Sequence, residues 1–319
     1  MSNTAIAASG LRKAYGDKTV LDGIDLDVRE GTVFSLLGPN GAGKTTAVNV
    51  LTTLLKADGG TVRVAGHDIA TEARAVRAAI GVTGQFAAVD ELLTGQENLQ
   101  LMADLKHLGA RVSRPVIAGL LERFDLAEAA GKLVSTYSGG MRRKLDLAMT
   151  LVGSPRIIFL DEPTTGLDPR SRRTMWDIVR GLVADGVTVF LTTQYLEEAD
   201  QLADRIAVLD KGRIVAQGTP AELKRQVPGS HIRLRFASVR DLDAAALLRP
   251  GATRDEENLT LRVPGDGGVK SLQALLAQLT EHSVNAEELS VHTPDLDDVF
   301  LALTGQPNTG HEKTEVSAR

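Results

Sequence analysis

The feature that most constrains this chain is a glycine-rich loop between an apolar strand and a helix. Residues 32–37 form a short apolar run, and the pattern over residues 44–55 predicts a helix. Glycines permit a tight turn that points backbone N–H groups at a phosphate chain, and the helix N-terminus adds its positive end. This order of elements predicts a nucleoside triphosphate site rather than a loop without a ligand. The predicted binding residues are Gly38, Pro39, Asn40, Gly41, Ala42, Gly43, Lys44, Thr45 and Thr46.

Side chains at two places suit a triphosphate bound with Mg²⁺. Lys44 supplies a positive charge for the terminal phosphates, and the Thr45 hydroxyl is an oxygen ligand of the kind that Mg²⁺ prefers. The apolar run 156–160 ends in Asp161 and Glu162. Such a pair is often a plain surface turn. In a chain with a phosphate loop we expect Asp161 to hold Mg²⁺ through water and Glu162 to polarise the attacking water.

Apolar strands and helical patterns alternate along the first two thirds of the chain, which predicts an α/β core. The runs 156–160, 187–191 and 205–209 suit a parallel sheet covered on both faces, and residues 170–183 read as a helix between two of them. Asp210-Lys211-Gly212 is a tight hairpin signal. Residues 86–151 indicate a helical insertion, with packing positions expected at Leu92, Leu93, Leu99, Leu101, Leu105, Leu120 and Leu121.

A second, smaller unit is predicted after the core. Residues 231–236 and 259–263 alternate apolar with polar side chains, as half-buried strands do, and residues 272–279 carry leucines at helical spacing. We therefore divide the chain into a nucleotide-binding domain at 1–228, a C-terminal accessory α+β domain at 229–305 and a polar tail at 306–319.

Composition excludes several classes of function. The chain has no cysteine, which excludes disulfide scaffolds and thiolate metal sites. The net charge of -5 gives no electrostatic case for nucleic acid as a partner. No apolar run approaches the length of a membrane-spanning helix, and the N-terminus lacks the pattern of a secretory signal. We expect a soluble chain that reaches a membrane only through a partner.

A third segment that suits phosphate chemistry ends the helical insertion. Ser138-Gly139-Gly140 precedes a helix that carries Arg142, Arg143 and Lys144. Ser138 could simply cap that helix, or the helix N-terminus could bind an anion. The anion could belong to this chain's own nucleotide or to the nucleotide of another subunit, and the residues alone leave both open.

Taken together, these motifs resemble the ATP-binding-cassette (ABC) ATPases over residues 4–225. The phosphate loop, Gln85, Ser138-Gly139-Gly140, Asp161-Glu162 and Gly166-Leu167-Asp168 occur in that family's order. The resemblance implies a P-loop NTPase cassette with a parallel-sheet core, an antiparallel β subdomain and a helical subdomain at about 86–151. It also implies ATP and Mg²⁺ as cofactors, and a homodimer that holds two ATP molecules head to tail.

The resemblance carries roles to particular residues. Ser138 and Gly140, with Gly139 between them, would contact the γ-phosphate bound by the partner subunit. Gln85 would sense Mg²⁺ and the attacking water, and Asp168 would lie at the dimer interface. Tyr15 matches the aromatic residue that stacks on adenine, although it could equally belong to the core.

Two residues depart from the family pattern. Gln194 stands where the family has its switch histidine; an amide can donate a hydrogen bond to a γ-phosphate but cannot become cationic. We expect hydrolysis to survive because Glu162 remains, without a pH dependence due to imidazole. Met141 stands where the signature usually has Gln, which removes one polar contact.

Finer likenesses point to ATPase subunits of the daunorubicin-resistance type. They lie in residues 81–90, 137–143 and 193–195, and in residues 293–305, which also read as an amphipathic helix. The likeness implies a peripheral protein on the cytoplasmic face of the cell membrane, docked on a separately encoded permease that exports a hydrophobic drug or natural product. The alternatives are a lipid or polysaccharide exporter ATPase, a ribosome- or DNA-associated ABC ATPase, and a regulatory module without turnover.

Overall fold

The computed structural model describes residues 4–226, 230–265, 268–292 and 294–305. The chain forms two compact units, one within residues 1–220 and one within residues 221–307, and each is described by itself. The predicted tail at 306–319 and the predicted boundary at 228 lie outside the described residues. Among the described helices, none combines the length and the apolar character needed to cross a bilayer.

A six-stranded sheet forms the centre of the first unit, in the order β10-β9-β3-β8-β7-β6. Its inner strands pair in parallel, and β10 pairs antiparallel with β9 through the predicted hairpin. The strands are β3 (Val33–Leu37), β6 (Ile80–Thr83), β7 (Ile157–Asp161), β8 (Thr188–Thr193), β9 (Arg205–Asp210) and β10 (Arg213–Gly218). Continuous apolar runs predicted four of the six strands, β3, β7, β8 and β9, to within about two residues, and the hairpin signal predicted β10, whereas β6 was not predicted.

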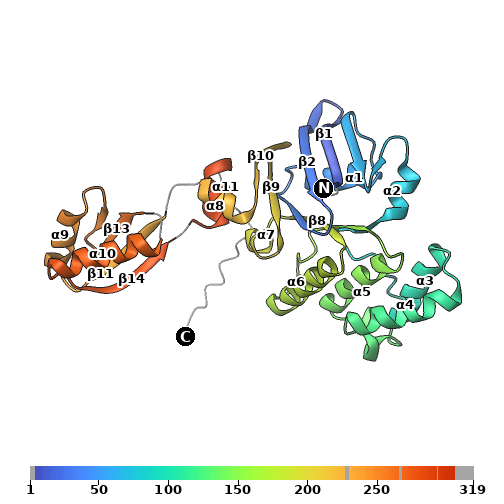
Figure 1. The fold of residues 1–319 in the computed structure, drawn as a ribbon. Helices are drawn as coiled ribbons and strands as arrows, with labels where there is room; N and C mark the ends of the chain where they lie inside the picture. The colour runs from blue at the N-terminus through green and yellow to red at the C-terminus, as the bar shows by residue number, and fades with distance from the viewer. Residues whose placement is uncertain (1–3, 227–229, 266–267, 293, 306–319) are drawn as a thin grey trace. The chain divides into compact units, whose positions relative to one another are not determined.

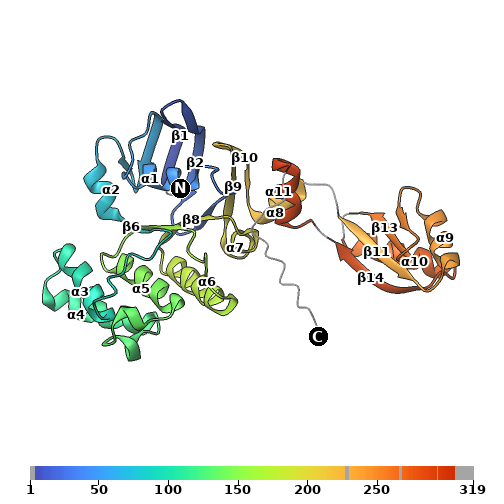
Figure 2. The same cartoon turned by 180° about the vertical axis from the view of Figure 1, so that it is seen from behind.

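The two faces of this sheet belong to different apolar clusters, which is why β3, β7 and β8 are buried along their whole length and are largely apolar. Ile158 and Leu160 of β7 join the cluster on the helical side, whereas Ile157 and Phe159 join the cluster on the opposite side. Figures 1 and 2 show α3 to α6 on one side of the sheet and α1, α2 and the antiparallel strands on the other. The helices of the core are α1 (Lys44–Leu51), α6 (Pro169–Ala184) and α7 (Leu196–Leu202).

An antiparallel sheet in the order β2-β1-β4-β5 lies within the same unit. Its strands β1 and β2 are long and pair from Thr4↔Arg29 to Tyr15↔Lys18, with several register shifts. Their buried side chains pack with those of α1 in one cluster. The elements are β1 (Thr4–Tyr15), β2 (Lys18–Arg29), β4 (Gly59–Val64), β5 (His67–Asp68) and α2 (Ala73–Ala79).

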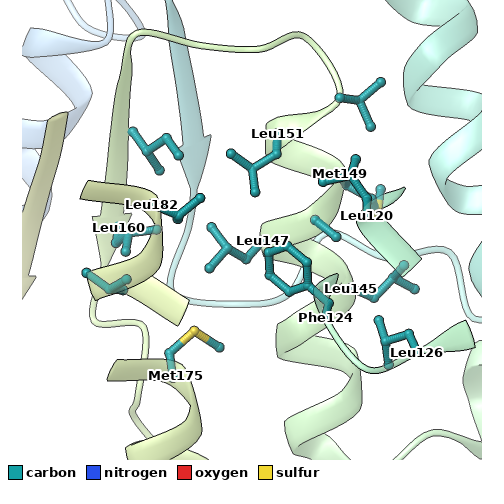
Figure 3. Close-up of a cluster of buried hydrophobic side chains, with 14 of the residues drawn as sticks. Leu120, Phe124, Leu126, Leu145, Leu147, Met149, Leu151, Leu160, Met175 and Leu182 are labelled. Carbon is teal, nitrogen blue, oxygen red and sulfur yellow. The ribbon is translucent and has the colours of Figure 1, made fainter. Parts of the chain in front are cut away.

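The predicted helical insertion contains α3 (Gly95–Leu105), α4 (Ala110–Arg123) and α5 (Gly139–Leu151), with single turns at Ala127–Ala129 and Val134–Thr136. Figure 3 shows how its side chains meet those of α6 and β7. Three of the seven expected packing leucines are buried, namely Leu99, Leu120 and Leu121. The expectation was wrong for Leu92, Leu101 and Leu105, which are 85%, 42% and 64% exposed.

The second unit contains the two predicted strands at the centre of a four-stranded sheet, β12-β13-β11-β14. Leu234 and Leu261 lie on its buried face together with Leu275 and Leu279 of α10. In both views α8 and α11 lie side by side, and Leu223, Val299 and Phe300 on them are buried. The elements are α8 (Pro220–Gln226), β11 (His231–Phe236), α9 (Val239–Leu248), β12 (Thr253–Asp255), β13 (Thr260–Pro264), α10 (Val269–Glu281), β14 (Ala286–His292) and α11 (Leu296–Thr304).

Candidate functional site

Three of the predicted motifs leave the same edge of the central sheet. Gly38 follows β3, and its N–H donates to the carbonyl of Thr193 at the end of β8, at 3.2 Å. Glu162 follows β7, and its N–H donates to the carbonyl of Thr192 at 3.1 Å. Gln194 directly follows β8. Because the carboxyl ends of parallel strands meet at one edge, the fold brings the loop, the carboxylates and Gln194 together.

The glycines of the phosphate loop are needed for two different reasons. A Cβ at Gly38 would lie 2.3 Å from the carbonyl oxygen of Leu209, so a close backbone approach excludes any side chain there. Gly43 has φ of 111°, in the left-handed region, and it directly precedes α1. The loop is therefore fixed in shape by its contacts with β9 and by the start of the helix.

Lys44 is almost completely buried beneath this loop. Its Nζ donates to the carbonyl oxygens of Gly38 at 2.8 Å and Pro39 at 3.2 Å, and it lies 3.2 Å from Oε1 of Glu162. Burial of the ammonium lowers the pKa of Lys44, and the Glu162 carboxylate opposes that shift. A phosphate that contacts Lys44 must therefore compete with a carboxylate that already holds it.

Glu162 occupies a backbone conformation that is unfavourable for a residue with a side chain. Its φ is 49°, in the left-handed region, so the turn after β7 stores strain of the kind that gathers at functional sites. Thr165 Oγ1 donates to Glu162 Oε2 at 3.3 Å, and Gln85 Nε2 lies at 3.5 Å from the same oxygen. The Glu162 carboxylate is thus in polar contact with Lys44, Thr165 and Gln85.

Asp161 is buried at the last position of β7 and has a partner within the sheet. Its Oδ1 accepts a hydrogen bond from the Thr192 hydroxyl of β8. Asp161 is 4% exposed and Glu162 is 7% exposed, so neither carboxylate lies on the surface. A surface-turn interpretation of this Asp–Glu pair is excluded by the burial of both side chains.

A cavity of about 550 Å³ opens beside the phosphate loop. Its wall includes eight of the predicted residues, namely Asn40, Gly41, Gly43, Lys44, Thr45, Thr46, Gln85 and Glu162. The other predicted residues lie outside its wall; they are Tyr15, Gly38, Pro39, Ala42, Ser138, Gly139, Gly140, Asp161, Asp168 and Gln194. A cavity of this size is in the range of small-molecule sites.

Five lining residues were missed by sequence reasoning. They come from the start of β2 and from the β9–β10 turn, and they are Lys18, Thr19, Val20, Lys211 and Gly212. The turn itself was recognised from its glycine, but nothing in the sequence indicates that it lies against a loop some 170 residues earlier. The only signal available was the lysine, which is unusual in so tight a turn.

Tyr15 is half exposed at the end of β1, with 51% of its surface accessible, so it does not belong to the core. The Lys13 ammonium lies 5.8 Å from the centre of its ring. An accessible ring at a strand end is able to stack on a planar ligand.

Ser138 caps α5, which is one of the two roles that the sequence left open: its Oγ accepts a hydrogen bond from the Met141 N–H at 3.2 Å. Gly140 approaches α6, because a Cβ there would lie 2.8 Å from Ser171 Oγ. Asp168 caps α6 and accepts from the Ser171 hydroxyl at 2.5 Å, which lowers the pKa of Asp168. The Ser138 and Asp168 motifs are therefore neighbours on the surface of one cassette.

Arg143 connects the segment after β6 to the turn after β7, a role that the sequence did not indicate. Its guanidinium donates to the carbonyls of Gly84 at 2.7 Å and Pro163 at 2.9 Å. Asp146 lies 3.3 Å from Arg143 and accepts from the Ala88 N–H. Burial lowers the pKa of Arg143 and raises that of Asp146. Helix α5 is thus tied to both loops that border the cavity.

A phosphate loop on a parallel sheet, a lysine–glutamate pair beneath it and a helical insertion that ends in Ser-Gly-Gly define an ATP-binding cassette. The ABC transporter family model matches residues 21–165. The daunorubicin resistance ATP-binding protein DrrA3 of Streptomyces coeruleorubidus is 53% identical over 307 residues, which cover 96% of this chain and 97% of that protein. The chain belongs to the ABC transporter family, in the group of daunorubicin and doxorubicin resistance ATP-binding proteins.

More distant relatives agree on the cassette. The Nod factor export ATP-binding protein I of Ralstonia nicotianae is 40% identical over 307 residues, covering 96% of this chain and 95% of that protein. A dimeric cassette in a post-hydrolysis state bound to ADP and Pi superposes with a TM-score of 0.61 at 26% identity, covering 67% of this chain and 98% of that one. The chain is thus an ABC ATPase, and the relatives do not favour a ribosome- or DNA-associated role.

Proposed function

We propose that this chain powers export of a hydrophobic drug or natural product through a separately encoded membrane permease, bound at the cytoplasmic face of the membrane. The cargo class rests on the 53% identity with a daunorubicin resistance protein over nearly the whole of both chains. The chemistry rests on one observation: Lys44, Glu162 and Gln85 meet on the wall of one cavity beside the phosphate loop.

In the proposed reaction, each residue of the cavity has a separate task. The N–H groups of the loop and the Lys44 ammonium hold the phosphates. When Lys44 turns to the phosphates, Glu162 is released to accept a proton from the attacking water, and the Gln85 amide helps to orient that water. The ion pair between Lys44 and Glu162 thus couples the availability of the base to the arrival of the nucleotide.

The donor set fits Mg²⁺. Thr45 and Gln85 lie on the cavity wall, where Thr45 supplies a hydroxyl and Gln85 an amide oxygen. Asp161 supplies a carboxylate from the last position of β7. The described residues contain no cluster of three acidic or histidine side chains. Mg²⁺ in nucleotide sites needs only one or two protein ligands besides the phosphates, so this set is sufficient. The ion would neutralise phosphate charge.

Gln194 is proposed to donate a hydrogen bond to the terminal phosphate from the end of β8. Its position directly after Thr193, whose carbonyl holds the N–H of Gly38, supports this assignment. An amide does not titrate between pH 5 and pH 9, so no pH dependence of turnover should arise at this position.

The site is proposed to be completed by a second copy of the chain. Ser138 and Gly139 are exposed, and neither they nor Gly140 line the nucleotide cavity of the same chain. This favours contact with the nucleotide that the partner subunit binds over contact with the nucleotide of their own chain. Asp168 would lie in the same interface through its contact with Ser171. Tyr15 is proposed to stack on adenine. The accessory domain, 229–305, is proposed to support assembly with the permease.

Transport into vesicles tests the cargo. The chain is co-expressed with a candidate permease, and inside-out vesicles are supplied with Mg-ATP and daunorubicin. We expect drug uptake that stops in Glu162→Gln vesicles containing the same amount of both proteins. ATP turnover that responds to a lipo-oligosaccharide but not to daunorubicin would replace drug export with the lipid or polysaccharide alternative.

A further inference from the structure

The β9–β10 turn contributes two residues, Lys211 and Gly212, to the wall of the nucleotide cavity. Two backbone hydrogen bonds hold this turn in place. The Gly212 N–H donates to the carbonyl of Ala42 in the phosphate loop at 3.1 Å, and the Asp22 N–H donates to the carbonyl of Gly212 at 2.9 Å. Lys211 therefore has a fixed position relative to the phosphate loop.

The approach of this turn is too close for a side chain at its second position. A Cβ at Gly212 would lie 2.5 Å from the carbonyl oxygen of Val20. An ion pair of 2.6 Å between Arg213 and Asp22 joins the following residue to β2. The turn is thus built into the site and is not a loop that happens to lie near it.

Lys211 occupies this turn against its conformational preference. Asp210 pairs with Arg213, so the turn has two central residues, and both have positive φ, 46° at Lys211 and 80° at Gly212. Turns of this kind favour Asn, Asp or Gly at the first central position. A lysine there costs conformational energy, and strain of this sort is a pointer to function where it borders a site.

The charge of Lys211 is available to a ligand. Its side chain is exposed, and within the described part of the chain it has no ion-pair partner. Lys44, by contrast, is held by Glu162 and two carbonyls. Lys18, also exposed, is the other lysine on the cavity wall. A triphosphate carries several negative charges, more than the single buried ammonium neutralises.

We propose that Lys211 binds the phosphate chain of the nucleotide, as a cation that the β9–β10 turn adds to the phosphate loop. This inference rests on the nucleotide site of the proposed function. The strained turn keeps its backbone in place, so the side chain reaches the phosphates without reorganisation of the loop.

The test separates charge from backbone strain. Lys211→Asn removes the charge and suits the left-handed conformation, whereas Lys211→Arg keeps the charge. Lys132→Asn removes an exposed lysine that does not line the cavity and serves as the matched control. Dissociation constants for ATP, ADP and AMP are measured by calorimetry on the full chain at low and high salt, with thermal unfolding in the absence of nucleotide.

We expect Lys211→Asn to weaken ATP binding about two- to fivefold at low salt, with a smaller loss for AMP and a reduced effect at high salt. Lys211→Arg should bind as the wild type does, and Lys211→Asn should unfold at or above the wild-type temperature. Should Asn disturb the turn, Lys211→Gly gives the same comparison. ATP affinity in both charge-removing variants equal to that of Lys132→Asn would overturn the inference, whereas a wild-type chain that binds no ATP would instead overturn the proposed function.

Discussion

Replacing Glu162 by Gln tests the link between the buried ion pair and catalysis. The 3.2 Å separation of Lys44 Nζ and Glu162 Oε1 corresponds to a gross attraction of about 5 kcal/mol at an effective dielectric constant of about 20. Part of that attraction must be given up when Lys44 turns to a phosphate. Gln keeps the shape and one acceptor oxygen but removes the charge, and it also removes repulsion between the carboxylate and the nucleotide.

Three consequences should be measurable. ATP should bind about tenfold more tightly, because Lys44 no longer has to give up its attraction to Glu162 when it turns to the phosphates. A tenfold change needs only a minor part of the gross attraction of about 5 kcal/mol. Turnover should fall by about 10²- to 10⁴-fold, the usual contribution of a general base. The unfolding free energy without nucleotide should fall by up to about 3 kcal/mol, because Lys44 keeps its charge and loses its partner.

Calorimetry, phosphate release and urea titrations measure these quantities on the same preparation. Glu30→Gln is the control, since Glu30 pairs with Arg156 at 2.7 Å and does not line the nucleotide cavity. ATP binding that weakens while turnover stays within tenfold of the wild type would refute both the coupling and the role of Glu162. An ATP-bound Glu162→Gln chain that remains monomeric in light scattering would refute the proposed dimer.

Three further predictions concern the frame of the site. Gly38→Ala should abolish ATP binding, since its Cβ would lie 2.3 Å from a carbonyl oxygen, whereas Gly139→Ala, where a Cβ meets nothing within 4 Å, should bind normally; calorimetry distinguishes them. Ser138→Arg should keep the ATP affinity of the monomer and lower turnover at least about tenfold, and equal loss of both would place Ser138 in its own chain's site. Glu198 lies completely buried in α7, just after the end of β8, and burial raises its pKa. The contribution of Glu198 to stability is therefore fully present at pH values below its pKa in the unfolded chain. It is lost as the pH rises through its pKa in the folded chain. Urea unfolding from about pH 4 to about pH 9 should show the wild type losing stability relative to Glu198→Gln as pH rises, and parallel curves would contradict this.

The sequence predicted most of the central sheet, because strands that are buried on both faces are largely apolar. The apolar runs at residues 156–160 and 187–191 predicted β7 and β8 to within about two residues. The first helix ends at Leu51 rather than 55, and Thr53 shortly afterwards has φ of 63°, which no helical pattern reveals. The backbone conformation after a helix depends on where the next element of the fold lies, which the helical pattern does not contain.

The errors in the helical subdomain have a different origin. Leu92, Leu101 and Leu105 have the apolar character of packing residues, but periodicity shows only which side chains share a face and not whether another element covers that face. The contributions of Lys18 and Lys211 to the site were missed because they depend on tertiary contacts between distant hairpins. Motifs identify residues that are close in sequence, whereas a cavity wall gathers residues that are not.

The way in which Arg143 is bonded has a consequence for divergence within the family. Both of its short contacts, to Gly84 and Pro163, are made to backbone carbonyls, and so neither depends on a side chain of the loops that it joins. The side chains that follow Gln85, including the exposed Phe86, can therefore change without loss of these two hydrogen bonds. In a cassette built in this way, exposed side chains can diverge while α5 stays bonded to the backbone of the two loops that border the nucleotide cavity.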